Sequence, residues 1–176
     1  MIKKHYYSWQ DIADAANTIT VSMFKDNWKP DYIVGLTRGG LPLAVMLSNK
    51  LDIPMQTLNV SFRDGDSVES NNQMADDAFG MFQQGYAHEG KNILIVDDIN
   101  DTGATFQWIK DDWSKLYNFA DGVMGDSTRW DNVWGKNVRF AVITENLSSE
   151  FGLVNYSTHE VNKAEEDVWL VYPWEM

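Results

Sequence analysis

The stretch ILIVDDINDTGATF, residues 93–106, decides the fold of this chain. Four branched apolar residues run directly into two adjacent aspartates, and a third aspartate begins a turn that contains glycine. A short apolar run of this kind is typical of a buried strand, and Asp, Thr and Gly after it are typical of the start of a helix. We therefore predict a strand over 92–96, a helix over 102–117, and carboxylates just past the end of the strand.

The rest of the chain alternates strands and helices in the same way. Ser8 is a candidate N-cap, and Pro42 lies early in a helix, where its missing N–H costs little. Further strands are predicted over 32–36, 55–60, 138–144 and 168–172, and further helices over 8–27 and 41–51. This alternation favours one α/β domain, residues 1–176, with a mostly parallel, doubly wound sheet that binds ligands at the carboxyl ends of its strands.

Composition narrows the class of protein. The chain has 176 residues, of which 44% are hydrophobic and 23% charged, as in a folded globular domain. It has no cysteine, which excludes disulfides, thiolate zinc sites and cysteine nucleophiles and fits a cytoplasmic setting. No stretch is apolar enough for a signal peptide or a membrane span. The net charge of −12 disfavours nucleic acid and anionic membranes as partners.

Two segments do not follow the alternation. Residues 61–90 are rich in Gly, Asp, Asn, Ser and Gln without periodicity, and we predict a long mobile loop that acts as a lid. A tolerated surface insertion is the alternative for this segment. Residues 118–136 are rich in turn-forming residues, and the sequence assigns them no role.

The acidic stretch has the chemistry of a phosphate and metal site. Asp97 and Asp98 offer the oxygen ligands that Mg²⁺ prefers. The turn DTGAT, residues 101–105, offers free amides and hydroxyls at a helix N-terminus, which favour an anion. An acidic protein could bind a phosphorylated ligand in this way, with amides around one phosphate and Mg²⁺ on the remaining charge. The alternative is that the acids only cap the helix and lie in a solvated turn.

These residues resemble a known signature. An apolar run, two acids, a third Asp and then Thr-Gly-x-Thr are similar to the binding motif of the type I phosphoribosyltransferases, which use 5-phosphoribosyl 1-pyrophosphate (PRPP). The stretch VGLTRGGLPLAVMLSNKLDIP, residues 34–54, resembles the pyrophosphate loop and following helix of the 6-oxopurine (xanthine-guanine) branch. YYSWQDI, residues 6–12, and EEDVWLVYPWEM, residues 165–176, resemble its N-terminal helix start and its purine hood.

The resemblance implies a role for each matching residue. Asp97 and Asp98 would hold the ribose and Mg²⁺, and Asp101 would be the acid/base at the purine N7. The 5-phosphate would be wrapped by Asp101, Thr102, Gly103, Ala104 and Thr105. The pyrophosphate would be bound by Thr37, Arg38, Gly39 and Gly40. At position 104 the xanthine-guanine enzymes usually carry glycine, and an alanine is tolerated if its backbone is not left-handed.

The base would be bound by the C-terminal hood, residues 145–176. Trp169 would stack on the base, and Leu170 would offer backbone groups to it. A buried core position is the alternative for Trp169. Where the 6-oxopurine enzymes carry a lysine that reads O6, this chain has Asn146, whose amide could still donate; Lys163 is a remote substitute.

The function implied is transfer of the phosphoribosyl group from PRPP to a nucleobase, most simply guanine, xanthine or hypoxanthine in purine salvage, with release of pyrophosphate. One alternative is a phosphoribosyltransferase of the same fold that acts on a pyrimidine or another base. A second alternative is a non-catalytic regulator that senses PRPP or nucleotides. The resemblance also implies a homodimer or homotetramer.

Overall fold

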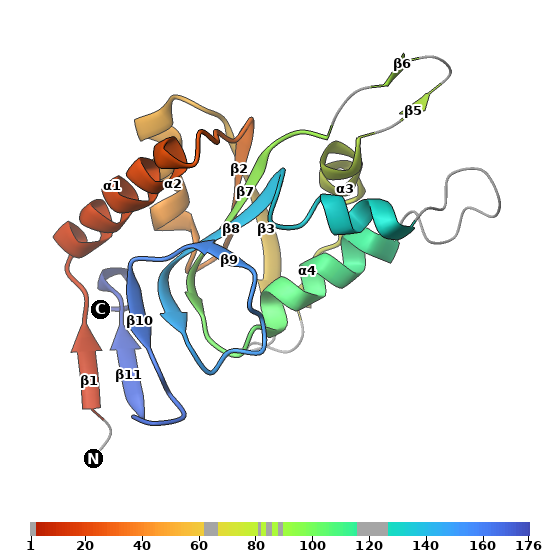
Figure 1. Cartoon of the computed structure of the whole chain (residues 1–176). Helices are drawn as coiled ribbons and strands as arrows, with labels where there is room; N and C mark the ends of the chain where they lie inside the picture. Colours follow the sequence, from red (N-terminus) through yellow and green to blue (C-terminus); the bar gives the residue numbers. More distant parts are fainter. Residues whose placement is uncertain (1–2, 62–66, 81, 84–85, 88–89, 116–126) are drawn as a thin grey trace.

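The structure is a computed structural model that describes residues 3–61, 67–80, 82–83, 86–87, 90–115 and 127–176. A central sheet lies between two layers of helices, and a separate sheet formed by the two ends of the chain stands beside it (Figure 1). This arrangement confirms the predicted α/β fold. Within the described ranges, no helix combines the length and the apolar character that a membrane span requires.

The central sheet is parallel apart from one edge. Among the described residues its strand order is β10-β8-β7-β2-β3-β4, and β9 pairs with β8 outside this path. Neighbouring strands run parallel, whereas β4 joins β3 in the antiparallel sense. The strands are β2 (Tyr32–Thr37), β3 (Met55–Ser61), β4 (Ser67–Val68), β7 (Ile93–Asn100), β8 (Val138–Asn146), β9 (Val154–Tyr156) and β10 (His159–Val161).

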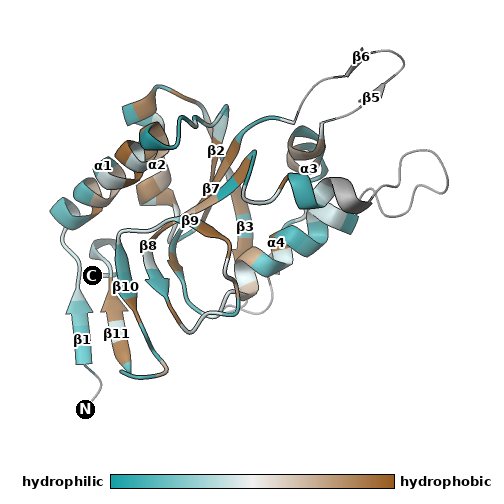
Figure 2. Cartoon of the chain, in the orientation of Figure 1, coloured by the Kyte–Doolittle hydropathy of each residue, from teal (hydrophilic) through white to brown (hydrophobic). Residues whose placement is uncertain are grey.

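Helices cover both faces of the sheet, because alternate side chains of the buried strands point to opposite faces. On β7, Leu94 and Val96 pack in a core with α1 and α2, whereas Ile93 and Ile95 pack in a second core with α3 and α4. Figure 2 shows the hydrophobic colouring concentrated on β7 and its neighbours between these layers. The helices are α1 (Trp9–Lys25), α2 (Leu41–Leu51), α3 (Asn72–Phe79) and α4 (Ala104–Lys115).

The first helix begins as its sequence predicts. Ser8 is the N-cap and forms a capping box with Asp11, whose backbone N–H donates to the Ser8 hydroxyl. The predicted apolar stripe is buried against the sheet in α1 and consists of Ile12, Ala15, Ala16, Ile19 and Met23.

The prediction of a structureless loop over 61–90 is wrong for its central part. Residues 72–79 form α3, and Asn71 caps it by accepting a 2.9 Å hydrogen bond from the backbone N–H of Met74. Met74 and Phe79 are buried in the core beneath α4, together with the two alanines between them. The helix has only eight residues, so its apolar positions are too few to show a clear period. Short strand pairs flank it: β4 with β3, and β5 (Phe82–Gln83) with β6 (Tyr86–Ala87).

The role of this segment as a lid stays a prediction, and its residues 62–66, 81, 84–85 and 88–89 lie outside the described residues. Residues 116–126 of the unassigned segment also lie outside them. The following residues begin with the 3-10 helix η1 (Ser127–Asn132) and add aromatic side chains to the core. The rings of Trp130 and Trp134 stack at 5.3 Å, and Trp134 lies 5.9 Å from Trp113 of α4.

The small sheet joins the two ends of the chain. Strand β1 (Lys3–Tyr6) pairs in parallel with β11 (Val168–Val171), in the register Lys3 to Val168. The strand near the C-terminus is predicted, but β1 is not, because all four of its residues are exposed and none is aliphatic. A last 3-10 helix, η2 (Pro173–Glu175), follows β11.

A polar network fastens the small sheet to the central one. The Tyr7 hydroxyl lies 2.6 Å from the Thr144 hydroxyl of β8 and also contacts Nδ1 of His159. The Tyr172 hydroxyl donates to the backbone oxygen of Asp98 at 3.2 Å and lies 3.1 Å from the Thr144 hydroxyl. Burial raises the pKa of Tyr172, so this phenol remains a donor at neutral pH. The hood is therefore tied directly to the acidic end of β7.

The surroundings of His159 predict that part of the stability of the folded protein is lost in acid. Burial of this ring, and repulsion by the neighbouring His5, lower the pKa of His159. The unfolded chain therefore takes up the proton first, so stability is retained above about pH 6.5 and declines as the pH falls below it. Urea unfolding at about pH 7.5 and about pH 5.5 measures how much the free energy of unfolding falls between the two pH values. This fall should be smaller for His159→Gln than for the wild type. Equal losses in both proteins would contradict this assignment.

Candidate active site

The acidic residues are brought to the site by β7. The strand continues through Asp97 and Asp98 to Asn100, because the long neighbour β8 supplies partners as far as Glu145. The prediction that both aspartates lie beyond the strand is therefore wrong, and only Asp101 follows it. Ile93 to Val96 are fully buried, whereas the carboxylate-bearing residues are partly exposed. The strand thus emerges from the core where its acids begin.

The turn after β2 packs on this acidic end. The Thr37–Arg38 peptide is cis, and Gly39 and Gly40 complete the turn before α2. A Cβ on Gly39 would lie 2.2 Å from Oδ2 of Asp98, and one on Gly40 would lie 2.2 Å from the backbone oxygen of Val96. The atoms next to Gly40 are backbone, so that position requires glycine, whereas a Cβ at Gly39 would displace the Asp98 carboxylate. The structure brings the predicted pyrophosphate loop against the predicted metal ligands.

The third predicted segment forms the turn into α4. Gly103 has φ +90°, and a Cβ there would lie 2.6 Å from the backbone nitrogen of Phe151. The Thr102 hydroxyl accepts a 3.3 Å hydrogen bond from the Ala104 backbone N–H, which begins the helix. Ala104 does not have a positive φ, so the methyl group is tolerated as the sequence predicts. Thr105 lies in the first turn of α4.

A cavity of about 580 Å³ opens in front of this turn. It is lined by Asp101, Thr102, Gly103, Ala104, Gln107, Asn146, Ser148 and Glu150. Most of the predicted 5-phosphate residues are thus found in one cavity. Arg38, Trp169 and Leu170 do not line it. Gln107, Ser148 and Glu150 also line the cavity and are not among the predicted site residues. The polar run after Asn146 is a sequence signal for Ser148 and Glu150, whereas Gln107 lies in α4 and has none.

A buried asparagine supports the back of the site. Asn100 is 2% exposed, and its amide nitrogen donates at 2.9 Å to Glu145 Oε1 and to the Phe151 backbone oxygen. The Ser149 hydroxyl donates to Asn100 Oδ1 at 3.1 Å. Burial raises the pKa of Glu145. Asn100 thus holds the segment after β8 against the end of β7.

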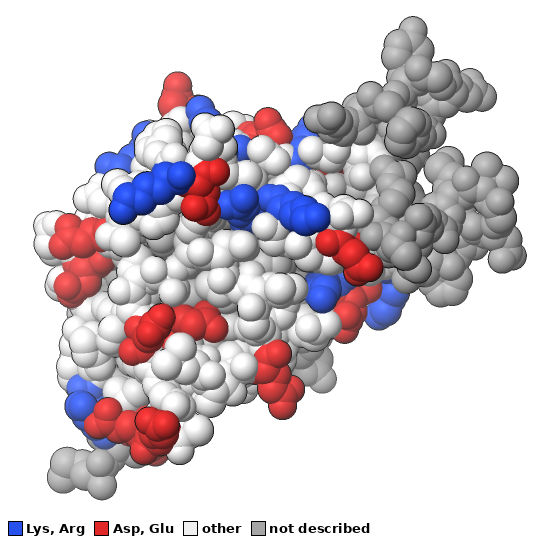
Figure 3. All heavy atoms as spheres, in the orientation of Figure 1, with Lys and Arg blue, Asp and Glu red and all other residues white. Residues whose placement is uncertain are grey.

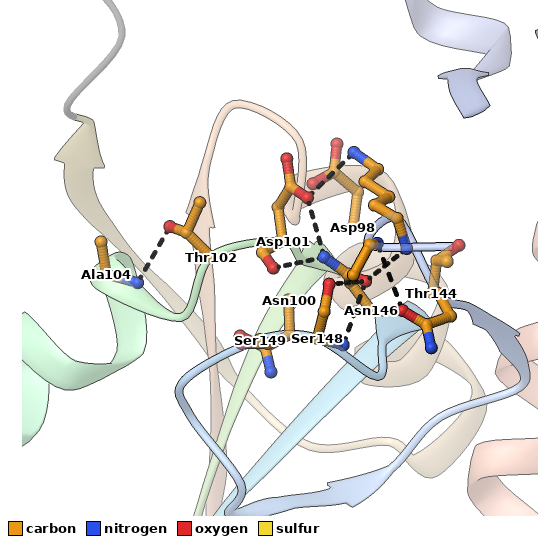
Figure 4. A network of polar contacts seen from close by, with 12 residues as sticks. Asp98, Asn100, Asp101, Thr102, Ala104, Thr144, Asn146, Ser148 and Ser149 are labelled. Carbon is orange, nitrogen blue, oxygen red and sulfur yellow. Dashed lines mark hydrogen bonds and ion pairs between the residues drawn. The ribbon is translucent and has the colours of Figure 1, made fainter. Parts of the chain in front are cut away.

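Asn146 and Lys163 meet at Asp101, as Figure 4 shows for the labelled Asn146 and Asp101. The Asn146 amide donates to the backbone oxygen of Asp101 at 2.9 Å, and its nitrogen lies 3.4 Å from the Asp101 carboxylate. The group that we predicted to donate to a base is therefore engaged within the protein. Lys163, which the sequence gives only as a remote substitute, lies with Nζ 2.9 Å from Asp101 Oδ1.

The hood residues differ in exposure. Trp169 is 58% exposed, so the alternative of a buried core tryptophan is wrong. Leu170, the next residue of β11, is buried and packs with the core between the sheet and α1. An exposed indole on a strand held by its neighbours is suited to stacking on a planar ring.

The oxygen donors at the end of β7 suit Mg²⁺. The described residues contain no group of three or more His, Cys, Asp or Glu side chains that could hold a metal ion. Mg²⁺ does not need such a group, because it keeps several waters and binds through one or two carboxylates together with phosphate oxygens. Asp97 and Asp98 are partly exposed and could supply those carboxylates.

The face in Figure 3 carries charged side chains of both signs, and several Lys and Arg side chains lie in a row across its upper part with acidic side chains among them. There the described Lys and Arg side chains are interspersed with Asp and Glu, and uncharged surface lies between them.

Comparison with known proteins gives consistent similarities. The pattern of the phosphoribosyl transferase domain matches residues 3–111. The chain is 26% identical over 180 residues to the xanthine-guanine phosphoribosyltransferase of Cereibacter sphaeroides, covering 99% of this chain and 88% of that protein. It is 23% identical to xanthine phosphoribosyltransferase 1 of Saccharomyces cerevisiae, covering 98% and 90%. The solved structure of a purine phosphoribosyltransferase from Pyrococcus horikoshii Ot3 is similar, with a TM-score of 0.63, 24% identity and coverage of 98% and 95%.

The packing of the glycine turn gives a prediction for stability. Gly40→Ala should lower the free energy of unfolding by about 1–3 kcal/mol, because the new methyl group overlaps backbone that cannot move independently. Gly152→Ala is the matched control, since a Cβ there meets nothing within 4 Å, and it should change stability by less than about 0.5 kcal/mol. Urea denaturation measures both. An equal effect of the two substitutions would show that the turn does not pack closely on β7.

Proposed function

We propose the following function from a family assignment: the pattern of the phosphoribosyl transferase domain matches more than half of the chain, so the protein belongs to that family. In the proposed reaction it transfers the 5-phosphoribosyl group of PRPP to a 6-oxopurine and releases pyrophosphate. The named relatives act, by their names, on xanthine and guanine or on xanthine. We extend that base class to this chain. We also propose that the protein acts in purine salvage in the cytoplasm and assembles as a homodimer or homotetramer.

One observation carries the proposal: the glycine turn after β2, which is distant in sequence, meets the acidic end of β7, from which the chain runs directly into the turn that begins α4. The glycine turn touches Asp98 and the backbone of Val96, and the turn into α4 follows Asp101. A ligand with a phosphate at one end and a pyrophosphate at the other has its complementary groups in these segments. The parallel sheet supports this, because its ligands bind at the carboxyl ends of the strands.

In this proposal the 5-phosphate lies in the cavity at the start of α4. The backbone N–H groups of the first turn of a helix have no intrahelical partner and attract an anion. Gly103 allows the tight turn, and Thr102 and Thr105 add hydroxyl donors. This arrangement offsets the negative charge of the protein locally.

The pyrophosphate would be held by Thr37, Arg38, Gly39 and Gly40. Arg38 can form charge-assisted, bidentate hydrogen bonds to phosphate oxygens. Asp97 and Asp98 would hold the ribose hydroxyls and Mg²⁺, directly or through water. The bound Mg²⁺ would neutralise charge on the leaving pyrophosphate.

Asp101 would act as the acid/base. As N9 of the purine forms its bond to the anomeric carbon, the bond to the pyrophosphate oxygen breaks and the pyrophosphate leaves with that electron pair. The proton on N7 passes to the Asp101 carboxylate. The anomeric carbon becomes oxocarbenium-like, as in glycoside hydrolysis, so nearby carboxylates stabilise its positive charge. Trp169 would stack on the base, and the backbone of Leu170 would contact its substituents.

The role proposed for Asp101 gives a prediction for catalysis. Asp101→Asn should lower kcat with PRPP, Mg²⁺ and hypoxanthine by about 10²–10⁴-fold, because the amide cannot accept the proton. Pyrophosphate release measures the rate. Asp14→Asn is the matched control on the exposed side of α1, where Asp14 accepts a hydrogen bond from Gln10, and it should leave kcat unchanged. Full activity of Asp101→Asn would refute its role.

The wild type should release pyrophosphate with guanine, xanthine or hypoxanthine in the same assay. Release only with a pyrimidine or another heterocycle would support the alternative base class and overturn the purine assignment. If none of the bases causes pyrophosphate release and PRPP still binds tightly, the result would support the sensing regulator instead.

The role proposed for Mg²⁺ gives a prediction for PRPP binding. PRPP at about 100 times its dissociation constant should raise the free energy of unfolding by about 2.7 kcal/mol when Mg²⁺ is present. A chelator should remove most of this stabilisation, because the ribose and pyrophosphate are proposed to bind with the metal. Thermal unfolding with PRPP alone, Mg²⁺ alone and both together separates these contributions. Equal stabilisation with and without Mg²⁺ would contradict the assignment of Asp97 and Asp98.

A further inference from the structure

A single phenol joins the two ends of the proposed site. The Tyr172 hydroxyl donates to the backbone oxygen of Asp98 at 3.2 Å and lies 3.1 Å from the Thr144 hydroxyl of β8. Tyr172 directly follows β11, the strand that carries Trp169. Asp98 is a proposed ligand of Mg²⁺ and the ribose. The bond therefore runs from the segment proposed to bind the base to the main chain of the segment proposed to bind the metal.

Asp98 lies where β7 has passed beyond its pairing with β2. The last residues that these two strands pair are Gly35 and Val96. The main-chain polar groups of Asp98 have side-chain partners: its N–H donates to Asp97 Oδ1 at 2.9 Å, and its carbonyl oxygen accepts from Tyr172. The position of Asp98 is therefore set in part by side chains, and one of them, Tyr172, comes from another element.

A small displacement of Asp98 would change the site. A Cβ on Gly39 would lie 2.2 Å from Asp98 Oδ2, so this carboxylate lies directly against the turn that carries Arg38. Binding groups must be held within about 0.5 Å of their working positions. A bond that fixes the main chain of Asp98 limits where its carboxylate can lie. Without that bond, part of the ordering of Asp98 would have to accompany ligand binding and would weaken it.

The ring of Tyr172 is itself held in place. The residue is 2% exposed, and its ring stacks on Tyr7 with 4.8 Å between centroids and on Trp174 with 5.0 Å. Phenylalanine at this position would keep the ring and its stacking and would remove the hydroxyl alone. The substitution Tyr172→Phe therefore separates the bond to Asp98 from the packing of the hood.

Tyr7 offers a matched comparison in the same network. It is buried as well, its ring is parallel to that of Tyr172 within 4°, and its hydroxyl lies 2.6 Å from the same Thr144 hydroxyl. The second partner of the Tyr7 hydroxyl is His159, whereas the second partner of the Tyr172 hydroxyl is Asp98. Two neighbouring phenols thus share one threonine and differ in the strand that they reach.

We propose that Tyr172 is a positioning residue for the Mg²⁺ and ribose end of the site, because its phenol holds the main chain of Asp98 in the place from which the carboxylate binds. The inference rests on the proposed function. It names a residue of the hood that serves the metal end of the site and acts through Asp98, without touching the ligand.

The test compares Tyr172→Phe with Tyr7→Phe in the full chain. With Mg²⁺ present, Tyr172→Phe should weaken PRPP binding about three- to ten-fold in calorimetry, since the net loss of one hydrogen bond corresponds to about that factor. Tyr7→Phe should bind PRPP within about two-fold of the wild type. Both variants lose a hydroxyl that contacts Thr144, so their thermal unfolding temperatures should fall by similar amounts.

Steady-state kinetics should show the same separation. Tyr172→Phe should raise KM for PRPP by the same three- to ten-fold, whereas KM for hypoxanthine should stay within about two-fold, because the stacked ring still holds β11. Equal PRPP affinity in Tyr172→Phe and the wild type, or equal losses in the two Phe variants, would overturn the positioning role and leave the proposed function standing. A wild type that does not bind PRPP with Mg²⁺ would overturn both.

A double-mutant cycle tests whether Tyr172 acts through Asp98. Asp98→Asn should weaken Mg²⁺-dependent PRPP binding by itself. Adding Tyr172→Phe to Asp98→Asn should cause less than about two-fold further loss, because the position of a carboxylate that has been removed no longer matters. Fully additive losses would show that Tyr172 affects binding by another route and would overturn the inference.

Discussion

The site depends on the close contact between two neighbouring strands at their carboxyl ends. β2 and β7 are hydrogen-bonded neighbours, and the turn after β2 lies directly on the acidic end of β7. The contact leaves no room for a Cβ at Gly39 or Gly40. If the turn were displaced by the size of one methyl group, the arginine-bearing loop would move away from the aspartates. In the proposed reaction, a pyrophosphate bound between this loop and the aspartates would require the contact to be maintained.

Two buried asparagines then order the loops around that contact. Asn100 ties the segment after β8 to the end of β7, and Asn146 ties Asp101 to the connection that carries Lys163. A neutral amide is suited to this task, because it both donates and accepts without the cost of burying a charge. The acids and the lysine can therefore remain partly solvated, while uncharged groups behind them fix their positions.

The sequence predicts four strands of the central sheet (β2, β3, β7 and β8), the strand β11 and three of the helices, because these depend on local patterns. The apolar run before Asp97 and the stripe after Ser8 are signals of this kind. It does not predict β1, α3 or the short strands β4, β5, β6, β9 and β10. β1 has no aliphatic residue and is defined by its pairing with a strand at the other end of the chain, and α3 is too short to show a period. The proximity of Lys163 to Asp101 is equally non-local, since it follows from the register of β10 on β8.

The pairing of β1 with β11 has a further consequence for how the protein is made. Lys3 pairs with Val168, so this ladder closes a loop that includes almost the whole chain. Contacts between such distant residues form late in folding, because the loop must be closed before they stabilise anything. A nascent chain on the ribosome can build the interior strands while its first residues still lack their partner. The strand that carries Trp169 can therefore pair with β1 only after β11 has emerged from the ribosome.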